Sequence, residues 1–255
     1  MELFDSHCHI DFEAFDDDRD DVFARMKQVG VSRIVAVAVE LEQTNRLINL
    51  VESRQGVWFS VGVHPNHETK QEPTVEDICR LANHDKCVAI GETGMDFFRT
   101  RVDAAVQEQR LRTHIRAAHL LNKPVIVHMR DADEVCLRIL KEENIQTCGG
   151  IMHCFSSNWE AASQALDMGM SISFSGNVTF KRNDELREVA AKVPDDAILI
   201  ETDSPYLAPV PMRGKRNDPS FVQHVAQCVA DVRNMPLHDL ARLSTNNACR
   251  RFQIT

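Results

Sequence analysis

The sequence predicts an α/β protein in which eight strands alternate with helices and close into a (β/α)8 TIM barrel, followed by C-terminal closing helices. Three observations carry this prediction: a series of short apolar runs, helical patterns between these runs, and a length of 255 residues. One barrel of this kind takes about 250 residues. No linker rich in Pro, Gly or Ser interrupts the chain, so we expect a single domain over residues 1–255.

The expected strands are short runs rich in Val and Ile, and several are apolar throughout, as strands buried on both faces are. In chain order they are Leu3–Phe4 running into His7, Arg33–Val39, Val57–Val63, Cys87–Ile90, Pro124–Val127, Gly149–Met152, Ser171–Phe174 and Ala197–Ile200. Strands that alternate with helices favour a parallel sheet. The alternative is an open doubly wound sheet. No Gly-x-Gly-x-x-Gly follows the first strand, which disfavours a dinucleotide-binding sheet.

The expected helices carry apolar residues at spacings of three and four, which places those residues on one helix face. In the first helix Val22, Met26 and Val29 follow this spacing, and Gly30 is typical of a helix end. The helices between strands are expected at Asp17–Val29, Gln43–Ser53, Val75–Ala82, Ala104–Leu121, Asp133–Lys141, Asn158–Met168 and Asn183–Lys192. Two closing helices are expected at Phe221–Val232 and Leu237–Phe252.

The composition restricts the possible partners and the compartment. The net charge of −9 disfavours non-specific binding of nucleic acid, because Lys and Arg supply most of the affinity for phosphate. No apolar stretch reaches the ~18 residues of a membrane span, and we find no secretory signal, so no membrane partner is expected. The eight cysteines include no Cys-x-x-Cys pair, which favours a reducing, cytoplasmic location. The oligomeric state stays open, and a monomer is compatible with the sequence.

Metal-binding side chains follow the expected strands. A strand alternates its faces, so His7 and His9 share one face while Cys8 points to the other. In parallel barrels the active site lies at the carboxyl ends of the strands. The residues at these ends are His7, His9, His64, Glu92, His128, His153, Glu201 and Asp203. Their coincidence favours a metal site over scattered polar residues of the core, and we expect the remaining histidines to be surface or packing residues.

The number of candidate ligands exceeds what one ion needs. Four histidines and two carboxylates, with His64 to spare, suit two divalent ions that share a bridging carboxylate and a bridging water. Glu201 and Asp203 share a strand face, and we expect one to be a ligand and the other a supporting acid. Asp5 lies on the same face as His7 and could orient an imidazole. Strand alternation turns Cys8 and Cys154 away from the ligands beside them.

The chain resembles the TatD-type metal-dependent deoxyribonucleases, relatives of the amidohydrolase barrels. Each motif alone is weak, but the ordered set spans nearly the whole chain and is specific. The motifs are Asp5-Ser6-His7-Cys8-His9, Gly62-Val63-His64-Pro65, Gly91-Glu92-Thr93-Gly94-Met95-Asp96, Lys123-Pro124-Val125-Ile126-Val127-His128, Met152-His153-Cys154-Phe155, Ser173-Phe174-Ser175-Gly176, Glu201-Thr202-Asp203-Ser204-Pro205-Tyr206, Arg213-Gly214-Lys215 and Asn246-Asn247-Ala248.

The resemblance implies a role for each candidate residue. One ion would be held by His7, His9, Glu92 and Asp203, and the other by Glu92, His128 and His153, with Glu92 bridging. The ions would be Mg²⁺, Mn²⁺ or Zn²⁺. His64 would face the substrate phosphate. The further substrate-binding candidates are Arg130, Arg213 and Lys215 for the strand backbone and Phe155 for stacking on a base, and the catalytic candidates are Asp203, Glu92, His64 and Glu201.

The expected function is phosphodiester hydrolysis, and specifically the trimming of DNA ends by a 3′–5′ exonuclease. Two ions would lower the pKa of a bridging water from about 15.7 towards about 7 and so provide a hydroxide. Asp203 would orient that water and accept its proton. The alternatives are an amidohydrolase or lactonase on the same barrel, and a metal-binding protein without catalytic activity. Met129 and Met95-Asp96-Phe97 depart from the family pattern, which leaves the substrate preference open.

Overall fold

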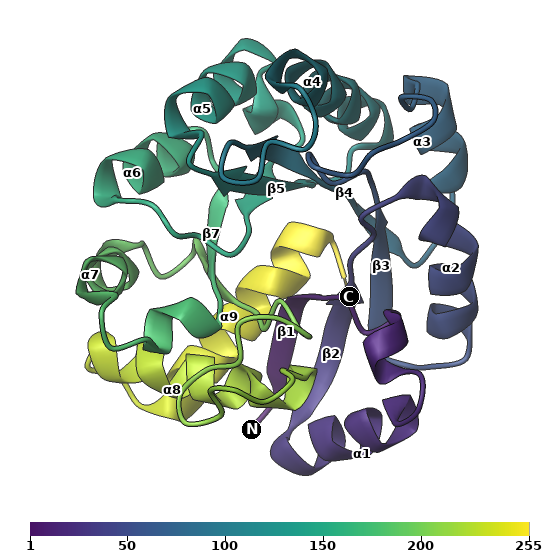
Figure 1. Ribbon diagram of the computed structural model, residues 1–255. Helices are drawn as coiled ribbons and strands as arrows, with labels where there is room; N and C mark the ends of the chain where they lie inside the picture. Colours follow the sequence, from purple (N-terminus) through teal and green to yellow (C-terminus); the bar gives the residue numbers. More distant parts are fainter. Residues whose placement is uncertain (255) are drawn as a thin grey trace.

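The computed structural model describes residues 1–254 and is a barrel of eight parallel strands surrounded by helices (Figure 1). The strands pair in chain order, from the first to the last. They are β1 (Leu3–Cys8), β2 (Val31–Ala36), β3 (Val57–Val61), β4 (Cys87–Asp96), β5 (Val125–Arg130), β6 (Gly150–Met152), β7 (Ser171–Phe174) and β8 (Ile198–Ile200). This architecture confirms the fold class that the alternating pattern predicts.

The helices begin and end within about two residues of their expected bounds. They are α1 (Arg19–Val29), α2 (Thr44–Glu52), α3 (Val75–Leu81), α4 (Ala104–Leu121), α5 (Asp133–Glu142), α6 (Trp159–Asp167), α7 (Asp184–Lys192), α8 (Val222–Val232) and α9 (Leu237–Phe252). The small differences come from capping. Asn158, for example, was expected inside a helix but precedes α6, where its side chain accepts a hydrogen bond from the Ala161 amide.

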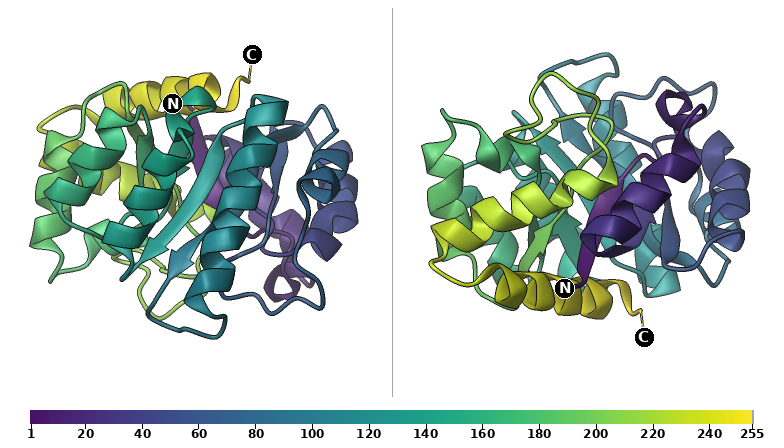
Figure 2. Two further views of the ribbon diagram at one scale, coloured as in Figure 1. Left: turned by 90° about the horizontal axis from the view of Figure 1, so that it is seen from above. Right: turned by 90° about the horizontal axis from the view of Figure 1, so that it is seen from below.

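The two closing helices have different positions. Helix α8 completes the outer ring, because it packs against α7, β1 and β8, so it is the eighth barrel helix and the prediction of two closing helices is wrong in this respect (Figure 1). Only α9 closes an end of the barrel, where it runs across the side on which the N-terminus lies (Figure 2).

The end of the barrel beneath α9 is filled with apolar side chains. Phe4 on β1 packs against Phe252 of α9 and Trp58 of β3, with ring centroids 6.0 Å apart in both pairs. The Asn247 side chain of α9 donates hydrogen bonds to the carbonyls of Asp195 and Ile198 and so fixes the helix to β8. Because this end is closed, any functional site in the barrel has to open at the carboxyl ends of the strands.

The seam between β8 and β1 is closed by individual contacts. The Ser6 hydroxyl donates to the Ile200 carbonyl at 3.0 Å, and the Asp203 amide donates to the His7 carbonyl at 2.9 Å. The buried Asp5 carboxylate accepts from the Thr202 amide at 2.8 Å. These contacts bring the segment that follows β8 alongside β1, so that Asp203 lies beside His7.

Strand β4 is longer than the sequence predicts. The apolar run ends at Ile90, but the chain continues as a strand to Asp96 because Thr93, Gly94 and Asp96 pair with β5. A Cβ atom at Gly94 would lie only 1.9 Å from the His128 carbonyl oxygen, so this close approach requires glycine. Glu92 therefore lies inside a strand and not in a loop after one, which holds its carboxylate rigidly.

Two further observations concern membranes and redox state. No helix within residues 1–254 is long and apolar enough to cross a bilayer. All eight cysteines are free thiols. The cytoplasmic location and the single-domain organisation stay predictions.

Candidate metal centre

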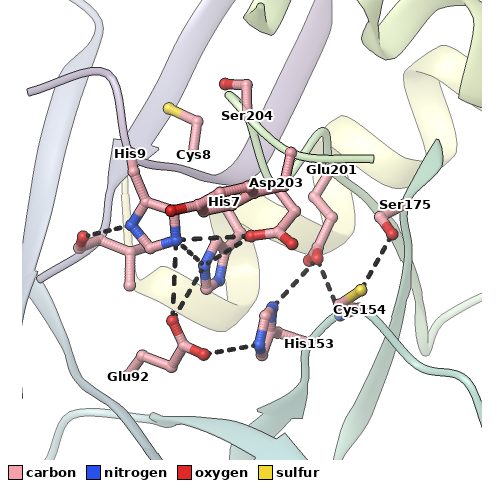
Figure 3. A network of polar contacts seen from close by, with 12 residues as sticks. His7, Cys8, His9, Glu92, His153, Cys154, Ser175, Glu201, Asp203 and Ser204 are labelled. Carbon is pink, nitrogen blue, oxygen red and sulfur yellow. Dashed lines mark hydrogen bonds and ion pairs between the residues drawn. The ribbon is translucent and has the colours of Figure 1, made fainter. Parts of the chain in front are cut away.

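Four side chains, carried by β1, β4 and the segments after β1 and β8, converge at the open end of the barrel (Figure 3). The Nε2 atoms of His7 and His9 lie 3.3 Å apart, and they lie 3.4 and 3.8 Å from Glu92 Oε2. Asp203 Oδ1 lies 3.4 Å from the same nitrogen of His9 and 3.7 Å from that of His7. The ligand atoms around a tetrahedral ion at ordinary bond lengths are about 3.3–3.6 Å apart, so this donor set fits a divalent metal.

The other oxygen of Glu92 faces a second group. Glu92 Oε1 lies 2.8 Å from Nδ1 of His128 and 3.0 Å from Nε2 of His153, and these two nitrogens are 3.3 Å apart. The ligand atoms of His7, His9 and Glu92 lie within 4.8 Å of one another, and so do those of Glu92, His128 and His153. Glu92 is 2% exposed, and its two oxygens point to different sets of imidazoles. One carboxylate therefore lies between two candidate ion sites.

Each of three imidazoles is oriented through its second ring nitrogen. His9 Nδ1 lies 2.9 Å from the Val37 carbonyl, which leaves Nε2 free to act as a ligand. His153 Nδ1 lies 3.2 Å from Glu201 Oε1, and His128 Nε2 lies 3.2 Å from Asp96 Oδ2. Such carbonyl and carboxylate partners fix the tautomer and increase the basicity of a metal-binding imidazole.

The charges of the centre are balanced by protons on its imidazoles when no ion is bound. Burial would raise the pKa of Glu92, but the charge of His153 and the contacts with His153 and His128 hold it well below the usual range. Burial would lower the pKa of His9, but the Asp203 and Glu92 carboxylates together raise it to about 9. A divalent ion would take the place of such protons among the same carboxylates.

This proton balance predicts a pH dependence of metal binding. At pH 6 to 8, below the pKa of about 9 at His9, an arriving ion has to displace the His9 proton. We therefore expect proton release on binding, and an apparent affinity that rises about tenfold per pH unit for each proton displaced. Calorimetric titration in buffers of different ionisation enthalpy measures the number released. An affinity that does not change over this interval would contradict the expectation.

His64 stands at the side of the centre and carries a hydrogen that points towards it. Its Nδ1 accepts from the Asn66 amide at 3.0 Å, and the buried Arg110 side chain donates to the His64 carbonyl at 2.6 Å. Burial, reinforced by the neighbouring His128, lowers the pKa of His64 to about 3. The ring is thus neutral, and with Nδ1 accepting, Nε2 carries the hydrogen, 3.6 Å from Glu92 Oε1. That N–H can donate to an oxygen of a bound ligand.

The structure contradicts the prediction that Phe155 stacks on a base. The ring is 2% exposed and packs in the hydrophobic core, so no face of it is open to a substrate. Phe155→Ala is therefore expected to destabilise the fold by about 3–5 kcal/mol, which chemical denaturation would measure. A variant of unchanged stability with weakened substrate binding would restore the stacking role.

Two other predictions about side chains at the centre need correction, the catalytic role of Glu201 and the orienting role of Asp5. Glu201 is fully buried, and its Oε1 accepts from the Cys154 amide and contacts His153, so it positions that imidazole and does not itself reach the open end (Figure 3). Asp5 contacts Thr202 and the His7 amide and no imidazole. Cys8 donates to the Val35 carbonyl, in keeping with its expected turn away from the ligands.

The predicted cationic residues lie further out. Arg130 is exposed, and its guanidinium stacks 3.8 Å above the Phe98 ring. Arg213 stacks 3.9 Å above the Phe180 ring, and Lys215 is exposed in the loop after β8. Their contacts with a nucleic-acid backbone stay predictions.

Asp96 is the residue that sequence reasoning missed. Its Oδ2 contacts His128 Nε2, and its Oδ1 accepts from the amides of Phe98 and Arg99. Despite its burial, the contact with His128 holds the pKa of Asp96 below its usual range, so it stays ionised. The signal was the alternating spacing of Glu92, Gly94 and Asp96, which places all three on one face of β4.

Asp96→Asn is expected to weaken metal binding at the group formed by Glu92, His128 and His153 by about 10- to 100-fold. The amide keeps the shape of the side chain and its oxygen can still accept from the two backbone amides, but the charge that polarises His128 is lost. Competition with a chelator of known affinity measures the effect. The exposed Asp85→Asn is the matched control, and equal affinities in both variants would contradict the role of Asp96.

Comparisons with known proteins agree with this arrangement. A family model described as TatD related DNase matches residues 4–253. The chain is 45% identical to the uncharacterized metal-dependent hydrolase YcfH of Escherichia coli over 100% of this chain and 97% of that protein. It is 32% identical to the 3′-5′ ssDNA/RNA exonuclease TatD of Salmonella typhimurium, over 99% of both chains.

A solved structure shows the same arrangement of the backbone. The crystal structure of YJJV, a TatD homologue from Escherichia coli, superposes with a TM-score of 0.93 at 28% identity and covers 99% of this chain and 98% of its own. The match of the family model over nearly the whole chain and the two sequence relatives lead to the same conclusion. The chain belongs to the TatD family and is a metal-dependent hydrolase of that family.

Proposed function

We propose that this hydrolase is a deoxyribonuclease that removes nucleotides from the 3′ ends of DNA with the help of two divalent metal ions. The observation that carries the proposal is the position of Glu92, whose two oxygens face separate groups of imidazoles at 2.8–3.8 Å. Paired ions that share a carboxylate are typical of enzymes that cleave phosphate esters. The relative named as a 3′-5′ ssDNA/RNA exonuclease supports the choice of substrate.

The proposed ligands follow the two groups. His7, His9 and Asp203, with Glu92 Oε2, would hold one ion, and His128 and His153, with Glu92 Oε1, would hold the other. Mg²⁺, Mn²⁺ and Zn²⁺ all accept imidazole and carboxylate donors to some degree. When bound, such ions act as Lewis acids towards a phosphoryl oxygen and increase the acidity of a coordinated water.

The side chains around the centre perform the remaining tasks. Asp203 is 14% exposed at its side chain, so its carboxylate can orient the attacking water and accept its proton. The Nε2–H of His64 donates a hydrogen bond to a phosphoryl oxygen, where negative charge increases during the reaction. Glu201 and Asp96 keep the imidazoles of His153 and His128 in place and do not touch the substrate.

The proposal also accounts for the acidic composition. A protein with a net charge of −9 has little general affinity for phosphate, so a strand would be held near the centre by the ions and a few placed side chains. Binding of this kind is weak, covers few nucleotides and decreases with salt, which suits an enzyme that trims ends. The eight free thiols favour the cytoplasmic setting that we include in the proposal.

The test is degradation of defined oligonucleotides with Mg²⁺, Mn²⁺ or Zn²⁺, with products separated by length. Single- and double-stranded DNA and RNA, labelled at the 5′ or 3′ end, are compared with panels of lactones and cyclic amides. The proposal requires a ladder that shortens from the 3′ end of DNA and disappears with a chelator. Turnover confined to lactones or amides would overturn it in favour of the amidohydrolase alternative. A protein inert towards every substrate would support the non-catalytic alternative.

A further inference from the structure

Two large aromatic side chains are exposed beside the candidate metal centre. The side chain of Phe98, in the loop after β4, is 58% exposed, and that of Tyr206, in the segment after β8, is 54% exposed. Among the described residues the other large exposed apolar side chains are Met1, Leu120 and Val210. Single exposed apolar residues are common on protein surfaces, but these two aromatic rings both belong to segments that carry candidate metal ligands, and this shared position suggests a ligand.

Phe98 is linked through Asp96 to the group of candidate ligands formed by Glu92, His128 and His153. Its amide donates to Asp96 Oδ1 at 2.9 Å, and the other oxygen of Asp96 lies 3.2 Å from His128 Nε2. The Arg130 guanidinium stacks 3.8 Å from the ring centroid. One carboxylate thus fixes both a candidate metal ligand and the turn that carries the aromatic ring, and the neighbouring Arg130 adds positive charge beside it.

Tyr206 contacts two candidate ligands of the other group, His9 and Asp203. Its amide donates to the Asp203 carbonyl at 2.9 Å, and its own carbonyl accepts from the buried Asn217 side chain. Its ring lies 6.3 Å from that of His9 and 6.5 Å from that of Phe12, which itself stacks on His9 at 4.7 Å. The aromatic rings of Phe12 and Tyr206 therefore lie directly beside the candidate ligands His9 and Asp203.

The two rings lie beside opposite groups of one centre. The Tyr206 ring lies 6.3 Å from that of His9, whose Nε2 lies 3.8 Å from Glu92 Oε2. The other oxygen of Glu92 lies 2.8 Å from His128 Nδ1, and His128 Nε2 lies 3.2 Å from the Asp96 carboxylate, which accepts from the Phe98 amide. Glu92 and the candidate ligands around it therefore lie between the two segments that carry the rings.

We propose that Phe98 and Tyr206 are stacking platforms for unpaired bases on either side of the phosphate that is cleaved. The inference rests on the proposed nuclease function and names the part of the site that binds the strand. Stacking works with any base and needs no positive net charge, so it supplies affinity that an acidic surface lacks. Paired bases cannot lie on such platforms, so the preferred substrate is a single strand, and the role predicted for Phe155 belongs to these two residues.

The test compares Phe98→Leu and Tyr206→Leu with the wild-type holoenzyme in steady-state degradation of single-stranded DNA with Mg²⁺. Loss of one base stack is expected to raise KM by about 5- to 20-fold with little change in kcat, because stacking holds the strand before and during the reaction. A second strand carries three abasic residues at its 3′ end. On this strand both variants are expected to match the wild type in kcat/KM, since the partner of the ring is missing.

Three controls make the result specific. Tyr206→Phe keeps the ring and is expected to retain the wild-type KM, and Leu120→Ala removes an exposed apolar side chain of α4 without effect. Metal content and melting temperature show whether a leucine variant has an intact centre and fold. Unchanged KM in both leucine variants, or an equal loss on intact and abasic strands, would contradict the stacking role of Phe98 and Tyr206. The proposed nuclease function would not be affected by either result. A wild type that degrades no strand overturns the proposed function as well.

Discussion

Replacing Glu92 by alanine is expected to abolish hydrolysis and to lower the metal content by more than one ion per chain. The reason is geometric: Glu92 Oε2 lies 3.4 and 3.8 Å from the ligand nitrogens of His7 and His9, whereas Oε1 lies 2.8 and 3.0 Å from those of His128 and His153. Removing the carboxylate leaves two groups of imidazoles without the negative charge that both share. Equilibrium dialysis followed by elemental analysis measures the bound metal, and degradation of a labelled strand measures activity.

The matched control for this variant is Glu188→Ala, which removes an exposed carboxylate from α7 and is expected to leave metal content and activity unchanged. A melting temperature close to that of the wild type would show that the fold survives, although alanine leaves a cavity beneath a buried site. If Glu92→Ala lost one ion and kept the second fully bound, the carboxylate would serve a single site and the bridging role would be wrong.

The barrel could be predicted from the sequence because its pattern is local. Each strand is a short apolar run, each helix has a one-sided apolar face, and the order of the two repeats eight times. The position of α8 could not be predicted, because its pattern is the same whether it completes the ring or closes an end. Its place follows from packing against α7, the helix before it, and against β1, which lies at the other end of the chain.

The positions of the candidate ligands could be predicted only as strand ends. That rule predicted that His7, His9, His128 and His153 lie at one edge, where the structure gathers them around Glu92. It failed for residues whose roles depend on burial. Phe155 follows a candidate ligand in the sequence but turns into the core, whereas Asp96 is far from the end of the apolar run yet continues the face that carries Glu92.

The hydrogen-bond partners of the imidazoles could not be predicted from the sequence either. Glu201 and Asp5 share faces with candidate ligands, and spacing alone could not show that one supports His153 while the other binds the backbone of Thr202. Such differences arise where β8 and β1 meet at the seam, because there the Asp203 amide donates to the His7 carbonyl. The register of the hydrogen bonds there, and not the order of residues, decides which carboxylate meets which ring.

Asp203→Asn is expected to lower kcat by about 10²- to 10⁴-fold while much of the metal stays bound. Oδ1 of the carboxylate lies 3.4 Å from His9 Nε2, and asparagine can offer an oxygen at the same position. The amide cannot accept a proton, however, so the attacking water would lose the base that we propose for it. Single-turnover degradation at saturating Mg²⁺ separates this loss of chemistry from weaker binding, which would change KM and not the maximal rate.

Two comparisons decide between the roles of Asp203 as base and as ligand. The exposed Asp85→Asn serves as the control for the chemical change and should behave as the wild type. If added Mg²⁺ restored the rate of Asp203→Asn, the carboxylate would act through ion binding alone, because a missing proton acceptor cannot be supplied by a higher metal concentration. A rate that stays low while the metal content approaches that of the wild type would identify Asp203 as the proton acceptor. Three other carboxylates contact the imidazoles and are held there: Glu92 lies between them, Asp96 lies on His128 and Glu201 lies on His153.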